Sequence, residues 1–125
     1  MPCSLTFQKI MRWLALGWTV AIFLGMSIPG DGMPDLGNSR DKWVHGFAFF
    51  GIAILWRLAG WSWQRTLLFG VGYAIGTEVY QGVFTFLGRS GDWQDALADT
   101  TGLCIGLLIM QVFNFLLTKN PVTRP

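Results

Sequence analysis

The chain alternates between four long apolar blocks and short polar segments. The apolar blocks cover residues 13–28, 44–60, 66–87 and 97–117. Each block is close to the roughly 20 residues that an α-helix needs to cross about 30 Å of hydrocarbon. The pattern therefore predicts an all-α integral membrane protein, a bundle of four transmembrane helices that forms a single domain over residues 1–125.

The composition agrees with a membrane protein. Of the 125 residues, 52% are apolar and only 13% are charged, whereas a soluble domain of this size would carry more charge. The formal net charge of +2 therefore bears on topology, and we expect no nucleic-acid partner. Residues 24–30 contain no small-x-small cleavage site, so the first block is expected to be a retained helix and not a cleaved signal peptide.

Charged and aromatic residues predict how the helices are oriented. With the N-terminus in the cytoplasm, the basic residues of the inner side are Lys9, Arg12, Arg57, Arg65, Lys119 and Arg124. Those of the outer side are Arg40, Lys42 and Arg89. An excess of Lys and Arg on the cytoplasmic side is the general rule, so both termini are expected inside. Tryptophans favour membrane interfaces. The inner set is Trp13, Trp56, Trp61 and Trp63, and the outer set is Trp43 and Trp93.

Polar residues open the helix expected over residues 44–60. Asp41 and His45 are four residues apart, so they share one helix face. Asn38 could cap this helix while Asp41 supports its first turn, which would give Asp41 a purely structural role. That alternative leaves His45, one turn deeper, without an explanation.

A carboxyl group interrupts the helix expected over residues 66–87. Glu78 lies at least two turns inside its outer end, and a central charge costs about 2.5 to 3.5 kcal/mol on insertion scales. Such a residue usually faces the bundle interior and is functional, although a buried Glu can also bond to another helix for structure alone. Gln81 is about 60° away around the helix, so one partner could engage both. Gly72 and Gly76 could allow another helix to approach closely.

Along the helix expected over residues 97–117 and the residues just before it, one face carries aspartates followed by glycines. These residues fall within an arc of about 80° and are Asp92, Asp95, Asp99, Gly102 and Gly106. The two glycines form a small-xxx-small pattern that favours close helix packing, which turns the carboxylates inward. Asp92 and Asp95 could instead cap the helix or compensate its dipole, but Asp99 is too deep for that role.

These residues are expected to meet at the outer ends of the last three helices. The candidate catalytic residues are His45, Glu78 and Asp95, and the candidate substrate-binding residues are Asp41, Lys42, Gln81, Arg89, Asp92 and Asp99. The same residues could form an ion-pair network or a phosphate site. No spacing is diagnostic of a metal site, so metal and cofactor stay open at this stage.

The order of the polar motifs resembles that of the VanZ-like family of small bacterial membrane proteins. The motifs are Asp41-Lys42-x-x-His45 with Phe47 and Phe50, Glu78-x-x-Gln81, Arg89-x-x-Asp92-x-x-Asp95, and Gly102-x-x-x-Gly106. They span roughly residues 41–106. The family generally has Asn four residues after its second Asp, where this chain has Asp99.

The resemblance implies a multi-pass protein of the bacterial cytoplasmic (inner) membrane with a role at the cell envelope. The family takes its name from a protein associated with low-level resistance to the glycopeptide teicoplanin, but its members also occur widely without a resistance cluster. We therefore do not carry antibiotic resistance over to this chain.

Three functions are compatible with the sequence. The first is a module that binds an envelope lipid, a glycopeptide or a partner protein through the polar site. The second is a membrane enzyme acting on a phosphorylated, lipid-linked envelope precursor, with Lys42 and Arg89 on phosphate and His45 as general acid or base. The third, an ion or proton pathway, ranks last because the polar groups stop in the outer half. Membrane lipids are the expected partners, and the oligomeric state is left open.

Overall fold

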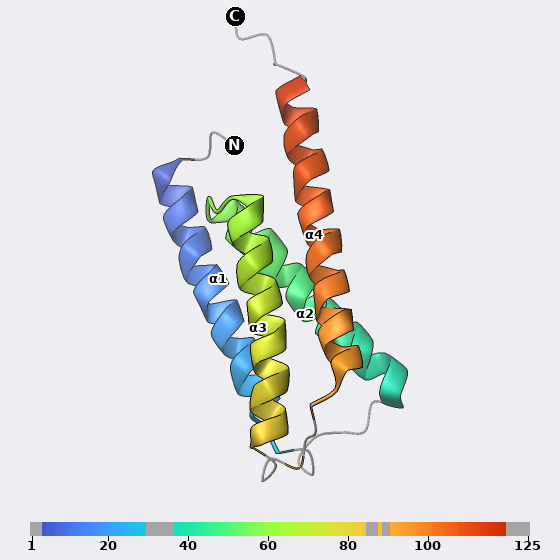
Figure 1. The fold of residues 1–125 in the computed structure, drawn as a ribbon. Coiled ribbons are helices and arrows are strands. Elements are labelled where there is room, and N and C mark those ends of the chain that lie inside the picture. Colours follow the sequence, from blue (N-terminus) through green and yellow to red (C-terminus); the bar gives the residue numbers. More distant parts are fainter. Residues whose placement is uncertain (1–3, 30–36, 85–87, 89–90, 120–125) are drawn as a thin grey trace, which may run out of the picture.

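The computed structural model describes residues 4–29, 37–84, 88 and 91–119, and over these ranges the protein is helical with no strand. The helices are α1 (Leu5–Met26), α2 (Gly37–Leu58), α3 (Trp63–Val83) and α4 (Trp93–Lys119). They alternate in direction, so α1 begins and α4 ends at the same end of the bundle as the α2–α3 turn (Figure 1). The all-α prediction and its four helices are confirmed.

Each helix begins before the apolar block that predicted it. The side chain of Ser4 caps α1 by accepting the N–H of Phe7 at 3.2 Å, and that of Ser62 caps α3 by accepting the N–H of Arg65 at 3.2 Å. A capped first turn can consist of polar residues, because its backbone is satisfied locally and its side chains need not be buried. The apolar blocks therefore mark only part of each helix.

Two of the described helices, α1 and α4, are long and apolar enough to cross a membrane. Helices α2 and α3 are of similar length but are less apolar. Large apolar side chains are exposed on every helix, including Leu14, Val44, Leu68, Leu108 and Phe113. Exposed apolar surface of this extent indicates contact with lipid or with another protein.

The largest helix–helix interface lies between α2 and α4, and glycines make it close. A Cβ placed on Gly102 would lie 1.9 Å from the carbonyl oxygen of Gly46, and one on Gly106 would lie 2.7 Å from the Cβ of Ala53. Neither position has room for a side chain. The predicted small-xxx-small contact on α4 is thus confirmed, with α2 as its partner.

The corresponding expectation for α3 is wrong. A Cβ on Gly72 or Gly76 would meet no atom within 4 Å, so neither residue lies at a helix contact. The close approach occurs at Gly70 instead, where a Cβ would lie 2.5 Å from the side chain of Leu103 on α4. Gly70 is on a different face of α3, and that face also carries the buried Ala74.

Three side-chain hydrogen bonds that involve Trp18 and Thr19 hold the middle of helix α1 against the bundle. The indole of Trp18 donates to the carbonyl of Ala48 at 2.9 Å, and that of Trp56 donates to the hydroxyl of Thr19 at 3.2 Å. The hydroxyl of Tyr73 donates to the carbonyl of Thr19 at 2.8 Å. These bonds fix α1 to both α2 and α3 near their middle.

One tryptophan does not fit the expected interfacial belts. Trp56 is buried and stacks on Trp61 with 4.0 Å between ring centroids. It is therefore part of the core. The exposed tryptophans are Trp13, Trp43, Trp63 and Trp93.

Candidate functional site

Eight of the nine predicted site residues gather at the end of the bundle where α2 and α4 begin and α3 ends. We call them the polar cluster: Asp41, Lys42, His45, Glu78, Gln81, Asp92, Asp95 and Asp99. The ninth, Arg89, lies outside the described residues. Each of the three helices contributes two or more of these residues.

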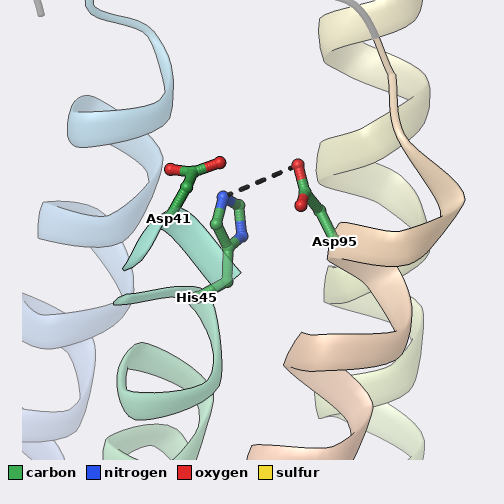
Figure 2. A group of neighbouring side chains, drawn as sticks. All are labelled: Asp41, His45 and Asp95. Atoms are coloured by element: carbon green, nitrogen blue, oxygen red, sulfur yellow. Dashed lines mark ion pairs between the residues drawn. The ribbon is translucent and has the colours of Figure 1, made fainter. Parts of the chain in front are cut away.

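His45 lies between two carboxylates of α4. Its Nδ1 is 3.0 Å from Oδ1 of Asp99, within hydrogen-bond distance, and its Nε2 is 3.9 Å from Oδ2 of Asp95. Figure 2 shows the imidazole between the Asp41 and Asp95 side chains, one turn below Asp41 on α2. The ring is buried, and the Asp99 contact fixes its orientation.

Lys42 and Asp41 form the outer rim of the polar cluster. The Lys42 ammonium lies 3.5 Å from Asp95 and 3.7 Å from Asp92, so it links α2 to the first turn of α4. Asp41 is exposed, and it offers a carboxylate oxygen within 4.8 Å of ligand atoms of His45 and Asp95. The ion-pair network considered from the sequence therefore exists at the rim.

Glu78 is the acceptor that joins α3 to the start of α4. Its Oε2 accepts the backbone N–H of Asp92 at 2.7 Å. A Cβ on Gly91 would lie 2.8 Å from the carbonyl oxygen of Glu78, so only glycine allows the segment to pass this close. The other oxygen, Oε1, is buried and has no hydrogen-bond partner in the part of the chain that the structure describes.

Gln81 has a different partner from Glu78. Its side-chain amide donates to the carbonyl of Met26 at 3.3 Å, at the end of α1. Nearby, the hydroxyls of Tyr80 and Ser27 are 3.1 Å apart and form a second link between α3 and α1. Within the described residues, Glu78 and Gln81 therefore bond to different parts of the chain, Glu78 to the residue before α4 and Gln81 to the end of α1.

Asp92 performs the capping role that was one alternative for it. It directly precedes α4, and its Oδ1 accepts the N–H of Gln94 at 2.9 Å. Asp95 is in the first turn of the same helix. The suggested Asn38 cap is wrong, since α2 already begins at Gly37.

Asp99 is the deepest carboxylate and is fully buried. Its Oδ1 contacts His45, whereas its Oδ2 has no hydrogen-bond partner within the described ranges. His45, Glu78 and Asp99 each offer one ligand atom, and the three atoms lie within 4.8 Å of one another. This separation suits the coordination of one small cation.

An apolar groove between α1 and α2 leads to the polar cluster. It has a volume of about 520 Å³, and its walls include Trp18, Ile22, Met26 and Phe47. Its polar end is formed by Asp41 and His45. The groove is not predictable from the sequence, because its walls come from apolar residues that resemble ordinary helix surface.

A second apolar groove of about 440 Å³ lies between α2 and α4. Its walls include Phe50, Ala98 and Ile105, and Lys42 stands at its polar end. Phe47 lines both grooves. The polar cluster is therefore flanked by apolar surface on two sides, and ligands with a polar and an apolar part would match this arrangement.

The chain matches a known protein family. Residues 5–114 match the model of a protein family described as VanZ/LLP1. The matched range includes all four helices up to the last turns of α4 and confirms the resemblance seen in the motifs. No curated protein and no solved structure matches the chain.

Proposed function

The chain belongs to the VanZ/LLP1 family, and on that premise we propose that it is a cell-envelope membrane protein that binds an amphipathic envelope lipid. The polar cluster takes the head group, and the groove between α1 and α2 takes the apolar chain. The observation that carries this proposal is the continuity of the groove with Asp41 and His45. A ligand lying along it would meet apolar walls first and charged groups at one end only.

In this proposal all four helices cross the bacterial inner membrane, with both termini in the cytoplasm and the polar cluster at the outer face. Helices α2 and α3 bury His45, Glu78 and Gln81, while Val44, Ile75 and Val79 are exposed. Basic residues occupy the opposite end, where Arg12 donates to the carbonyl of Ala59 at 3.2 Å. The positive-inside rule then favours the cytoplasm for that end.

The size and lining of the groove suit a hydrocarbon chain. Its volume of about 520 Å³ falls within the roughly 300–1,000 Å³ typical of ligand sites. Water would find few hydrogen-bond partners along Ile22, Phe47 and Ala48, so an apolar occupant is favoured by the hydrophobic effect. The Trp18 side chain, which lines the groove, is fixed by its hydrogen bond to α2.

Blocking the groove tests the proposal. Gly25 lines the groove, and a Cβ there would meet no atom within 4 Å, so Gly25→Phe fills the space without a backbone clash. Gly17→Phe is the matched control, because Gly17 lies on the same helix with the same free space but outside the groove. Native mass spectrometry of the detergent-purified chain should show a retained lipid in the wild type and Gly17→Phe, and its loss in Gly25→Phe. Equal retention in all three would refute the groove as the binding site.

A catalytic role is the second candidate, and the geometry of His45 favours it. Asp99 holds Nδ1 at 3.0 Å, while Nε2 at 3.9 Å from Asp95 is too far for a direct hydrogen bond. An imidazole oriented through one nitrogen can exchange a proton through the other. Release of inorganic phosphate from a phosphorylated lipid by the wild type, and not by His45→Gln, would establish an enzyme.

An ion or proton pathway has less support. Beyond the polar cluster, the fully buried side chains of α2 and α4 include Phe49, Ile52 and Leu103. A relay through the bundle would need titratable or hydrated groups at that depth. The buried apolar side chains therefore favour a site that opens at one end.

A further inference from the structure

We propose that His45, Glu78 and Asp99 form a binding site for one divalent transition-metal cation with the coordination chemistry of Zn²⁺ or Mn²⁺. The inference deepens the proposed function and rests on it for the view that the polar cluster is a binding site. Metal binding is nevertheless measured without lipid, so the two can fail separately.

The geometry of the three side chains fits a shared ion. Their ligand atoms lie within 4.8 Å of one another, and they come from α2, α3 and α4. Ligands about 2.0–2.2 Å from a metal lie roughly 3–4.3 Å from each other. The 3.0 Å separation between His45 Nδ1 and Asp99 Oδ1 therefore suits two ligands of one cation as well as a hydrogen bond.

Two oxygen atoms at this place have no partner among the described residues: Oε1 of Glu78 and Oδ2 of Asp99. Both side chains are buried, with 9% of Glu78 and none of Asp99 exposed. Buried polar atoms are nearly always hydrogen-bonded or bound to an ion, because leaving them bare costs their full desolvation. A cation held between the Glu78 and Asp99 carboxylates would offset this desolvation cost.

The charge balance also favours a cation. The described part of the polar cluster holds five carboxylates and one lysine: Asp41, Glu78, Asp92, Asp95, Asp99 and Lys42. Lys42 pairs with Asp92 and Asp95 at the rim, whereas Glu78 and Asp99 lie deeper. Like charges repel strongly where water is excluded. A divalent ion would neutralise the deep pair and give an anionic lipid head group a positive centre.

The donor set selects the class of metal. One imidazole nitrogen and two carboxylate oxygens form a mixed set, which suits Zn²⁺ or Mn²⁺ better than Mg²⁺ or Ca²⁺, whose sites are built from oxygen alone. A second group, formed by Asp41, His45 and Asp95, competes for the same imidazole. It is the weaker candidate because Asp41 is exposed and Asp95 already pairs with Lys42.

The test uses the full chain, purified in detergent with an affinity tag that contains no histidine and stripped of metal with a chelator. Calorimetric titration with ZnCl₂ and with MnCl₂ should show about one ion per chain for at least one of the two. Glu78→Gln and Asp99→Asn should each weaken that binding at least tenfold. Asp41→Asn, which removes a carboxylate only from the rim group, should bind as the wild type does.

Two further measurements separate a lost site from a lost fold. Metal-free Glu78→Gln should unfold at the same temperature as the metal-free wild type or at a higher one, because a repulsive buried charge is gone. The increase in unfolding temperature that metal causes in the wild type should be absent from this variant. His45 is the only histidine in the sequence. Pulsed electron paramagnetic resonance of the Mn²⁺-loaded wild type should therefore show coupling to an imidazole nitrogen, a result that needs no variant.

Three results would overturn the inference: a wild-type chain that binds neither Zn²⁺ nor Mn²⁺, bound Mn²⁺ without nitrogen coupling, or equal loss of binding in Asp41→Asn, which would place the ion at the rim. Lipid retention that depends on Gly25 and persists in the chelator-treated protein would leave the proposed function standing without the metal. Metal binding with no retained lipid would support the metal site and refute the proposed lipid binding.

Discussion

Gly102 of α4 lies directly against the backbone of Gly46 in α2, so close that a single added methyl group would overlap the Gly46 carbonyl oxygen at 1.9 Å. The contact is between backbones, which cannot move aside as a flexible side chain can. Gly46 directly follows His45 on α2, and Gly102 lies about one turn after Asp99 on α4. The spacing of α2 and α4 at this point therefore sets the distance across which the pair forms.

Gly102→Ala should force the two helices apart and lower the free energy of unfolding by about 2 kcal/mol or more, as expected for overpacking against a rigid neighbour. Gly72→Ala is the control, since a methyl group at Gly72 meets open space and should change stability by about 0.5 kcal/mol or less. Denaturation in mixed detergent micelles measures both. Equal stability of the two variants would show that α2 and α4 are not closely packed.

His45 and Asp99 should be energetically coupled. A double-mutant cycle with His45→Gln and Asp99→Asn should give a coupling energy of about 1–3 kcal/mol, because each single change leaves a buried polar group with an inferior partner. The cycle is measured by denaturation of the metal-free protein in micelles. Additive single changes would mean that the 3.0 Å contact does not persist in solution.

Asp92 should behave as a helix cap. Asp92→Ala removes the acceptor for the N–H of Gln94 and should destabilise the protein by about 1 kcal/mol. Asp92→Asn keeps an acceptor there and loses only the partly exposed ion pair with Lys42, so its effect should be smaller. If Asn is as harmful as Ala in a thermal unfolding assay, the charge of Asp92 matters and its capping bond does not.

Labelling tests the orientation in the membrane. Gln94 and Gln64 are exposed at opposite ends of the bundle, at the starts of α4 and α3. In a background with Cys3→Ser and Cys104→Ser, a membrane-impermeant maleimide should label Gln94→Cys in intact cells and Gln64→Cys only after permeabilisation. The reverse pattern would place the polar cluster on the cytoplasmic side.

The sequence was sufficient to predict the helices because each of them contains a long block with few polar residues. The first residue of each helix was predicted too late in the sequence, since a first turn capped by a residue such as Ser4 or Ser62 need not be part of an apolar block. The gathering of the polar cluster was also predictable, because unpaired charges on apolar helices are stable only when they face one another. The individual hydrogen-bond partners were not predictable from the sequence, as the different partners of Glu78 and Gln81 show.

Glycine spacing was informative on α4 and misleading on α3. Gly102 and Gly106 share their helix face with three carboxylates, so the inward direction was already fixed by the acids. Gly72 and Gly76 have no such companions, and the helix instead turns Gly70 toward Leu103. Trp56 was misassigned because an indole is suited both to a membrane interface and to a core with a hydroxyl partner such as Thr19.

Helix α1 contributes no charged group to the polar cluster, yet it forms one wall of the groove that leads there. Recognition would thus be divided between two parts of the molecule. The last three helices would bind the head group, and α1 would determine the length of hydrocarbon chain that fits. Exchanging small residues such as Ala21 and Gly25 on that wall would change the accepted chain length while leaving the head-group chemistry intact.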